Sequence, residues 1–82
     1  ALRDARVRRL ALEALTLIDA VDPPLAVAAA SDPDAQTRRL GVRAAATLEG
    51  ADAAIARGVT DPAPMVRIEA LRSLRTRQGD QA

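Results

Sequence analysis

Three stretches of the chain repeat one pattern of apolar, small and charged positions. Counted from Val7, Thr37 and Val66, which lie 30 and 29 residues apart, every stretch has small residues at offsets 4 and 7. In an α-helix, at about 100° per residue, offsets 0, 3, 4, 7 and 11 share one side that covers roughly a third of the circumference. In the first two stretches this side holds Val7, Leu10, Ala11, Ala14 and Ile18, and Thr37, Leu40, Gly41, Ala44 and Leu48. The pattern predicts three long amphipathic helices, over about residues 4–18, 34–49 and 63–77.

A second apolar strip follows each predicted helix, beside a constant arginine. Offset 1 is always arginine and offsets 5 and 8 are apolar, which gives Arg8, Leu12 and Leu15, then Arg38, Val42 and Ala45, then Arg67, Leu71 and Leu74. A helix with two apolar sides can pack against its own partner helix and against the next unit of a stack. Because periods of 20 to 50 residues are typical of stacked units, the chain is predicted to be an all-α array of helical repeats.

Proline and glycine positions predict two shorter helices between the long ones. Asp22 and Pro23 suit the N-cap and the first position of a helix over about residues 23–30. Another short helix is expected over about residues 51–59, and Gly58 within it suggests that it is frayed.

The turns around these helices contain further capping signals. Asp32 and Asp61, each followed by proline, are predicted N-caps of the second and third long helices, and Gly50 is a predicted C-cap. Residues 78–82 are expected to form a polar tail.

Residues Asp61 to Leu74 contain the pattern Asp-Pro-x-x-x-Val-Arg-x-x-Ala-x-x-x-Leu, and variants of it occur in all three stretches. This pattern resembles the HEAT repeat, in particular the short repeats of phycobilisome-lyase-type HEAT proteins. The resemblance implies a right-handed α-solenoid of about two and a half helical hairpins, each an A helix followed by a B helix, with roughly five helices in all. Residues 1–82 would then be a single HEAT-like domain, and we expect it to be a fragment of a longer array.

The resemblance also implies roles for the repeated charged residues. In that family the arginine after the valine pairs with an aspartate in the A–B turn, which forms a ladder between repeats. Carried over by position, the structural ladder consists of Arg8, Arg38, Arg67, Asp32 and Asp61. The second copy departs from the pattern at Thr37 and Gly41, so a weaker middle helix is expected.

Composition narrows the chemistry that the chain can support. The sequence has no cysteine or histidine, so disulfides, zinc sites and thiol chemistry are not expected, and Ser31 and Ser73 have no histidine or lysine to activate them. Asp32 and Asp34 could together bind a cation, but Ca²⁺ needs six or more oxygen ligands, so capping and ladder pairing are favoured. We therefore expect no enzyme activity, no metal and no cofactor, and no tetrapyrrole pocket despite the resemblance to phycobilisome proteins.

Other compositional features concern the origin of the chain. All 12 basic residues are arginine and alanine is abundant, which resembles the bias of a GC-rich bacterial genome. No apolar run is long enough for a membrane span, and no signal peptide is recognisable. A bacterial, cytoplasmic protein without a membrane partner is expected.

The net charge of +1 conceals an uneven distribution. The predicted long helices carry +1, +1 and +3, and the remaining residues carry −4. Offsets 2, 6 and 9, opposite the core side, hold most of the surplus arginines. We take these as candidate partner-binding residues: Arg9, Arg39, Arg43, Arg72 and Arg75. They would form a basic groove on the concave surface that the B helices line in HEAT-like arrays, or they would only solvate an exposed helix face.

Three functions are compatible with these features. The first is a protein-protein interaction scaffold, whose basic face binds another protein or an acidic segment. The second is binding of nucleic-acid backbone, although the chain lacks aromatic residues for stacking on bases and has little net charge. The third is a structural segment that associates end to end with a second copy through Val7, Leu10 and Leu15, because terminal repeats normally carry polar outer faces.

Overall fold

The computed structural model describes residues 4–81, and within them the side chains of residues 4–77. This part of the chain contains α-helices and no strand, so the all-helical prediction is confirmed. The helices are α1 (Ala5–Leu17), α2 (Pro23–Ala29), α3 (Ala35–Ala45), α4 (Asp52–Val59) and α5 (Pro64–Gln81). None of them is long and apolar enough to cross a membrane, as far as the described residues extend.

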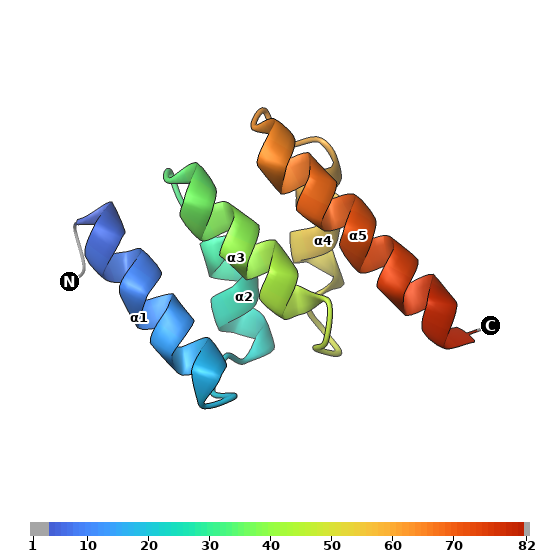
Figure 1. The fold of residues 1–82 in the computed structure, drawn as a ribbon, viewed down its shortest axis with the longest axis horizontal. Coiled ribbons are helices and arrows are strands. Elements are labelled where there is room, and N and C mark those ends of the chain that lie inside the picture. Colours follow the sequence, from blue (N-terminus) through green and yellow to red (C-terminus); the bar gives the residue numbers. More distant parts are fainter. Residues whose placement is uncertain (1–3, 82) are drawn as a thin grey trace.

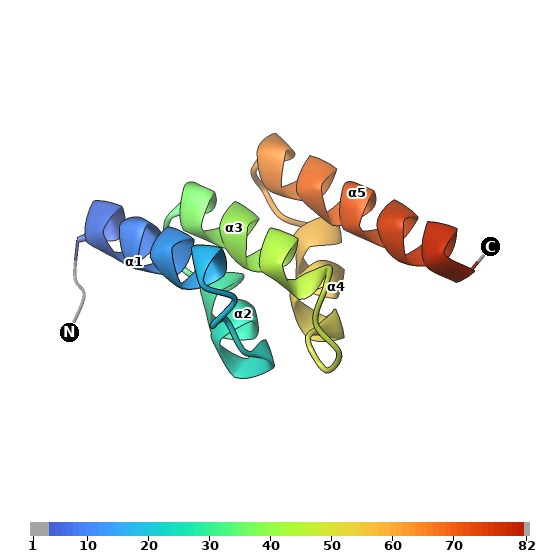
Figure 2. The same cartoon turned by 60° about the horizontal axis from the view of Figure 1, so that its bottom comes forward.

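The helices form two layers, in which the long and short helices are separated. Figure 1 shows α1, α3 and α5 side by side, with α1 and α5 at opposite ends of the longest axis. In the turned view of Figure 2, α2 and α4 lie on one side of this row. Helix α3 contacts each of the other four helices, and α2 packs on α3 as α4 packs on α5. The middle long helix is therefore the centre of the molecule.

Aspartate carboxylates begin three of the helices. The side chains of Asp4, Asp22 and Asp34 accept hydrogen bonds from backbone amides in the first turns of α1, α2 and α3. The prediction that Asp32 caps the second long helix was wrong, because its carboxylate accepts the Asp34 amide instead and leaves the cap position to Asp34. Asp61 has the same place before α5, where it accepts the amide of Ala63. Asp32-Pro33 and Asp61-Pro62 thus shape the turns before α3 and α5 and do not cap these helices, whereas Asp22 of the Asp22-Pro23 pair does cap α2.

Two predicted helix ends were also wrong. Helix α3 stops at Ala45, not near residue 49, because the next amides bond three residues back, as in Leu48 to Ala45 O at 3.2 Å. The prediction of Gly50 as the C-cap was wrong too, because the C-cap of α3 is Ala46. Gly50 lies beyond this tightened turn, at φ +87°, a left-handed conformation that glycine adopts without strain. Helix α5 extends to Gln81 where a polar tail was expected. Residues 78–81 contain no proline, and a single glycine costs a helix only about 1 kcal/mol.

The core is built from small side chains, with alanines surrounding a few larger residues. Its members are Ala26, Ala30, Val42, Ala45, Ala51, Ala54, Ile55, Val66 and Ala70. Gly41 lets α2 lie directly on α3, because a Cβ atom there would be 2.6 Å from the Ala30 nitrogen. Gly58 similarly faces Ala70 and Val42. The glycines that we expected to weaken the middle helix and to fray α4 therefore permit close packing of helix pairs.

Candidate interaction groove and arginine ladder

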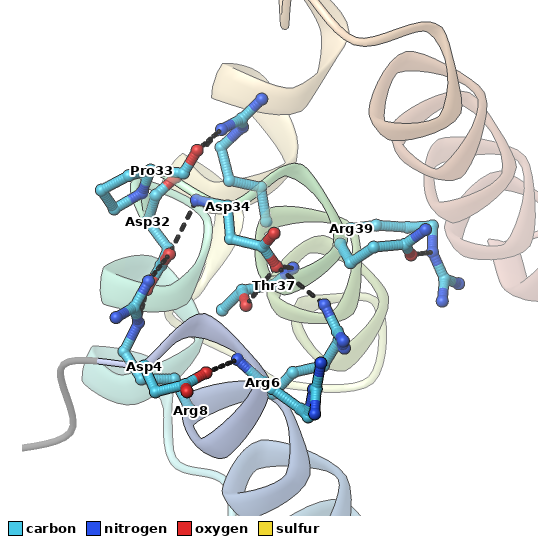
Figure 3. A network of polar contacts seen from close by, with 11 residues as sticks. Asp4, Arg6, Arg8, Asp32, Pro33, Asp34, Thr37 and Arg39 are labelled. Atoms are coloured by element: carbon cyan, nitrogen blue, oxygen red, sulfur yellow. Dashed lines mark hydrogen bonds and ion pairs between the residues drawn. The ribbon is translucent and has the colours of Figure 1, made fainter.

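Two arginines each join a long helix to the turn of the next helical hairpin through paired hydrogen bonds to an aspartate. Arg8 on α1 donates from Nε and Nη2 to the two carboxylate oxygens of Asp32, at 2.8 and 2.9 Å (Figure 3). Arg38 on α3 binds Asp61 in the same way, at 2.8 and 3.2 Å. Two parallel bonds between a guanidinium and a carboxylate fix orientation as well as distance. The pair therefore sets how far one hairpin is shifted along its neighbour.

In Arg38 and Arg67, the guanidinium nitrogen Nη1 donates to the turn that precedes the helix carrying the arginine. Nη1 of Arg38 donates to the carbonyl oxygens of Asp32 and Pro33, at 3.0 and 2.9 Å. Nη1 of Arg67 donates likewise to the carbonyl oxygens of Asp61 and Pro62, at 2.7 and 3.1 Å. Arg67 has no carboxylate partner among the described residues. The five predicted ladder residues are thus joined as two complete rungs and one rung that lacks its aspartate.

The ladder carboxylates lie in surroundings that favour their charged forms. The hydrogen bonds from Arg8 hold the pKa of Asp32 below its ordinary value. Burial alone would raise the pKa of Asp61, but the bonds from Arg38 and from the Ala63 amide outweigh it, so this pKa is lowered too. The pKa of Asp34 is lowered by the hydroxyl and the amide of Thr37. Asp32, Asp61 and Asp34 are therefore ionised at neutral pH.

A groove of about 680 Å³ lies between α1, α3 and α5, and no residue of α2 or α4 lines it. Its floor and rim combine aliphatic and charged side chains, among them Leu17, Leu40, Arg39, Arg43, Arg72, Glu13 and Glu69. Leu17 is 87% exposed, and Arg43 and Arg72 are also exposed. An open surface of this kind suits a peptide segment better than an enclosed small molecule.

The structure places the five candidate arginines in two groups. Arg9 forms an ion pair with Asp34 at 3.3 Å, and Arg39 forms one with Glu69 at 3.5 Å, so the charges of both are compensated. Arg43, Arg72 and Arg75 are exposed, and the described residues offer them no ion pair. Arg39, Arg43 and Arg72 line the groove, whereas Arg9 and Arg75 do not.

One acidic residue of the groove, Glu69, was missed in the sequence. Offset 3 is leucine in the first two repeats, but in the third it is Glu69, which lies beside Arg39 on the preceding long helix. Glu13 occupies the offset that holds arginine in the other two repeats. Comparing the three repeats at offset 3 would have shown Glu69 as the acidic exception.

Arg77 has a structural role that the sequence analysis also missed. Its Nη2 donates to the carbonyl oxygens of Ala45 and Leu48, at 2.7 and 2.8 Å, just past the end of α3. Its Nη1 pairs with Asp52 at the start of α4. The signal was offset 11, which is Ile18 and Leu48 in the first two repeats and becomes arginine in the third.

The two serines weighed as nucleophiles in the sequence form local hydrogen bonds. The hydroxyl groups of Ser31 and Ser73 donate to carbonyl oxygens four residues earlier, at 3.4 and 2.9 Å. No group of three acidic side chains among the described residues is placed to hold a metal ion.

No protein-family model, no curated protein and no solved structure matches the chain.

Proposed function

We propose that this chain is a HEAT-like helical repeat module of the α-solenoid type, and that it is a binding scaffold and not an enzyme. Three lines of support are the recurrence of the arginine-aspartate pairs at a spacing of 29 to 30 residues, the packing of α2 on α3 and of α4 on α5, and the row formed by the long helices. Each ladder pair links a long helix to the turn of the next hairpin, as expected of stacked units.

The groove between α1, α3 and α5 would bind an acidic segment of another protein that also carries apolar side chains. The observation that carries this proposal is the juxtaposition of uncompensated Arg43 and Arg72 with exposed Leu17 in one groove. The arginines would attract and orient an acidic segment, and the leucines would bury its apolar side.

Nucleic-acid backbone is the weaker alternative for this surface. A phosphate chain needs a continuous series of cations, whereas Glu13 and Glu69 interrupt the groove and Arg39 is already paired. The chain also has no aromatic side chain on which bases could stack. An acidic protein segment, with its charges further apart and apolar residues between them, matches the groove better.

The proposal is tested by titrating the isotope-labelled protein at low salt with a synthetic amphipathic peptide of Glu, Asp and Leu, and separately with duplex DNA. We expect the peptide to shift the Arg43 and Arg72 side-chain resonances and the Leu17 methyls, and the double variant R43E/R72E to bind at least about tenfold more weakly. The matched control R6E/R57E makes the same charge change at exposed arginines outside the groove and should reduce affinity by less than about threefold. Equal losses in the two variants would indicate only general charge attraction, and shifts with DNA but not with peptide would favour the alternative.

A further inference from the structure

The apolar positions of the strip at offsets 1, 5 and 8 are more covered in the first two repeats than in the third. Leu12 on α1 is 4% exposed and Val42 on α3 is 0% exposed, because the next hairpin lies over each of them. The corresponding Leu71 on α5 is 55% exposed, and Leu74 beside it is 38% exposed. The column at offset 5 is therefore buried, and that at offset 8 at least half-buried, wherever a following hairpin is present.

Arg67, at offset 1, is the polar member of this strip in the third repeat. Arg8 and Arg38 each direct Nε and Nη2 at the aspartate of the following turn, at 2.8 to 3.2 Å. Arg67 is already held at its own turn through Nη1, and its Nε and Nη2 have no carboxylate partner in the part of the chain that the structure describes. Its guanidinium is thus anchored in the place from which Arg38 binds the next repeat.

A shallow apolar groove of about 470 Å³ adjoins this strip. Ile55, Val59 and Leu74 contribute to its lining, so it joins the exposed side of α5 to α4. We call Arg67, Leu71, Leu74 and Val59 together the α5 docking face.

We propose that the α5 docking face binds a helical hairpin with an aspartate in its turn, placed against α5 as the α4–α5 hairpin is placed against α3. Charge complementarity determines the choice of occupant: a carboxylate at the position equivalent to Asp61 would complete the bonds of Arg67, while the helices of the hairpin cover Leu71 and Leu74. This inference rests on the proposed repeat architecture and not on the peptide groove.

A second copy of the chain does not meet this requirement. A second copy has two aspartates in the turns between a short helix and the following long helix, Asp32 and Asp61. Both already bind arginines of their own chain, Arg8 and Arg38. Docking a second copy through these turns would break one existing rung for each rung formed. The occupant is therefore a hairpin whose turn aspartate is not paired.

An in-frame duplication of residues 50–78 tests the proposal. The sequence then runs from 1 to 78 and continues from 50 to 82, which keeps every original residue and places a copied Asp61 29 residues after the first. We expect the copied hairpin to fold on α5, amide hydrogen exchange in α5 to slow at least about tenfold, and the exposed Leu71 methyls to become protected.

Two variants of the duplicated chain separate specific docking from a general effect of length. Asp→Asn at the copied Asp61 should reverse most of the slower exchange, and Leu71→Ser in the first copy should do the same, whereas Ala53→Ser at an exposed site of α4 should not. Unchanged exchange in α5, a copied hairpin with random-coil chemical shifts, or no effect of the Asp→Asn change would overturn the proposal. Peptide binding at Arg43 and Arg72 serves as a separate readout, so this inference can fail while the proposed groove function stands.

Discussion

At the scale of single residues, the arginine-aspartate pairs connect the sequence repeat to the geometry of the fold. Asp61 is only 6% exposed at its side chain, yet it accepts bonds from two nitrogens of Arg38 and from the amide of Ala63. A buried carboxylate without such partners would be strongly destabilising. The Arg38–Asp61 pair therefore fixes the position of the α4–α5 hairpin along α3. A hairpin shifted along its neighbour would leave both charges poorly hydrogen-bonded.

The lowered pKa values of Asp32 and Asp61 make stability depend on pH in one direction. The unfolded carboxyls titrate near pH 3.9, and the folded ones lower. Between these values the unfolded chain binds more protons, so the free energy of unfolding rises with pH. We expect it to be constant above about pH 5 and to fall as the pH drops below about 4, as measured by urea unfolding between pH 7 and pH 3.

Substitution of Asp61 shows how much of this dependence belongs to one rung. Asp61→Asn should lower the free energy of unfolding at neutral pH by about 2–3 kcal/mol and reduce the loss at acidic pH, because a charge-assisted pair is broken. Asp19→Asn removes an exposed carboxylate at a left-handed position that asparagine tolerates, and it should leave stability at neutral pH nearly unchanged. A slope as steep in the Asp61 variant as in the wild type would contradict this assignment.

At the scale of the helices, the sequence predicted which segments are helical and, to within a residue, the bounds of α1, α2 and α4, but not the ends of α3 and α5. The offsets identify the apolar side of each helix. In the third repeat, residues such as Val66 and Ala70 define this side, whichever helix packs against it. Helix ends depend on contacts between segments that are far apart in sequence. The end of α3 is fixed by a tightened turn and by Arg77 of α5, more than 25 residues away, which no local pattern can indicate.

The cap that Arg77 provides leads to a prediction about α3. A cation at the carbonyl end of a helix interacts favourably with the helix dipole, and this one also bonds two carbonyl oxygens. Arg77→Met, which keeps the aliphatic stem, should lower the free energy of unfolding by about 1–2 kcal/mol, a value at the modest end because the side chain is 30% exposed. Thermal and urea unfolding would measure the loss.

The matched control for this prediction is the other partner of Arg77. Asp52 is largely exposed, so its ion pair is screened by solvent and contributes little. Asp52→Asn should therefore change stability much less than Arg77→Met. Equal losses in the two variants would show that the ion pair, and not the helix cap, stabilises this end of α3.

At the scale of the whole molecule, residue positions were easier to predict than pairing between helices. The offsets placed Arg39, Arg43 and Arg72 on long helices that do form one row, and these three line a common groove. They could not show that Glu69 would reach Arg39, because this depends on the stagger of α3 against α5. That stagger is fixed by the Arg38–Asp61 rung, so the charge of the groove follows from a structural contact on another side of α3.

The predicted self-association through Val7, Leu10 and Leu15 also depends on how the helices pack. Val7 and Leu10 are 44% and 57% exposed on α1, on the side that corresponds to the core side of α3. Leu15 does not belong with them, because it lines a hollow shared with α2. The surface available for association through α1 is therefore smaller than the sequence suggested, and it centres on Val7 and Leu10.

A patch confined to one helix should support only weak dimerisation, since stable interfaces bury far more area. We expect sedimentation velocity to show a concentration-dependent shift towards a dimer at roughly 0.1–1 mM, with Leu10→Glu abolishing it. Leu17→Glu introduces the same charge at the more exposed leucine of the peptide groove and should leave the dimer intact. A wild-type protein that sediments as a strict monomer throughout this range would exclude association through α1, and loss of the dimer only in the Leu17 variant would move the contact to the groove between α1, α3 and α5.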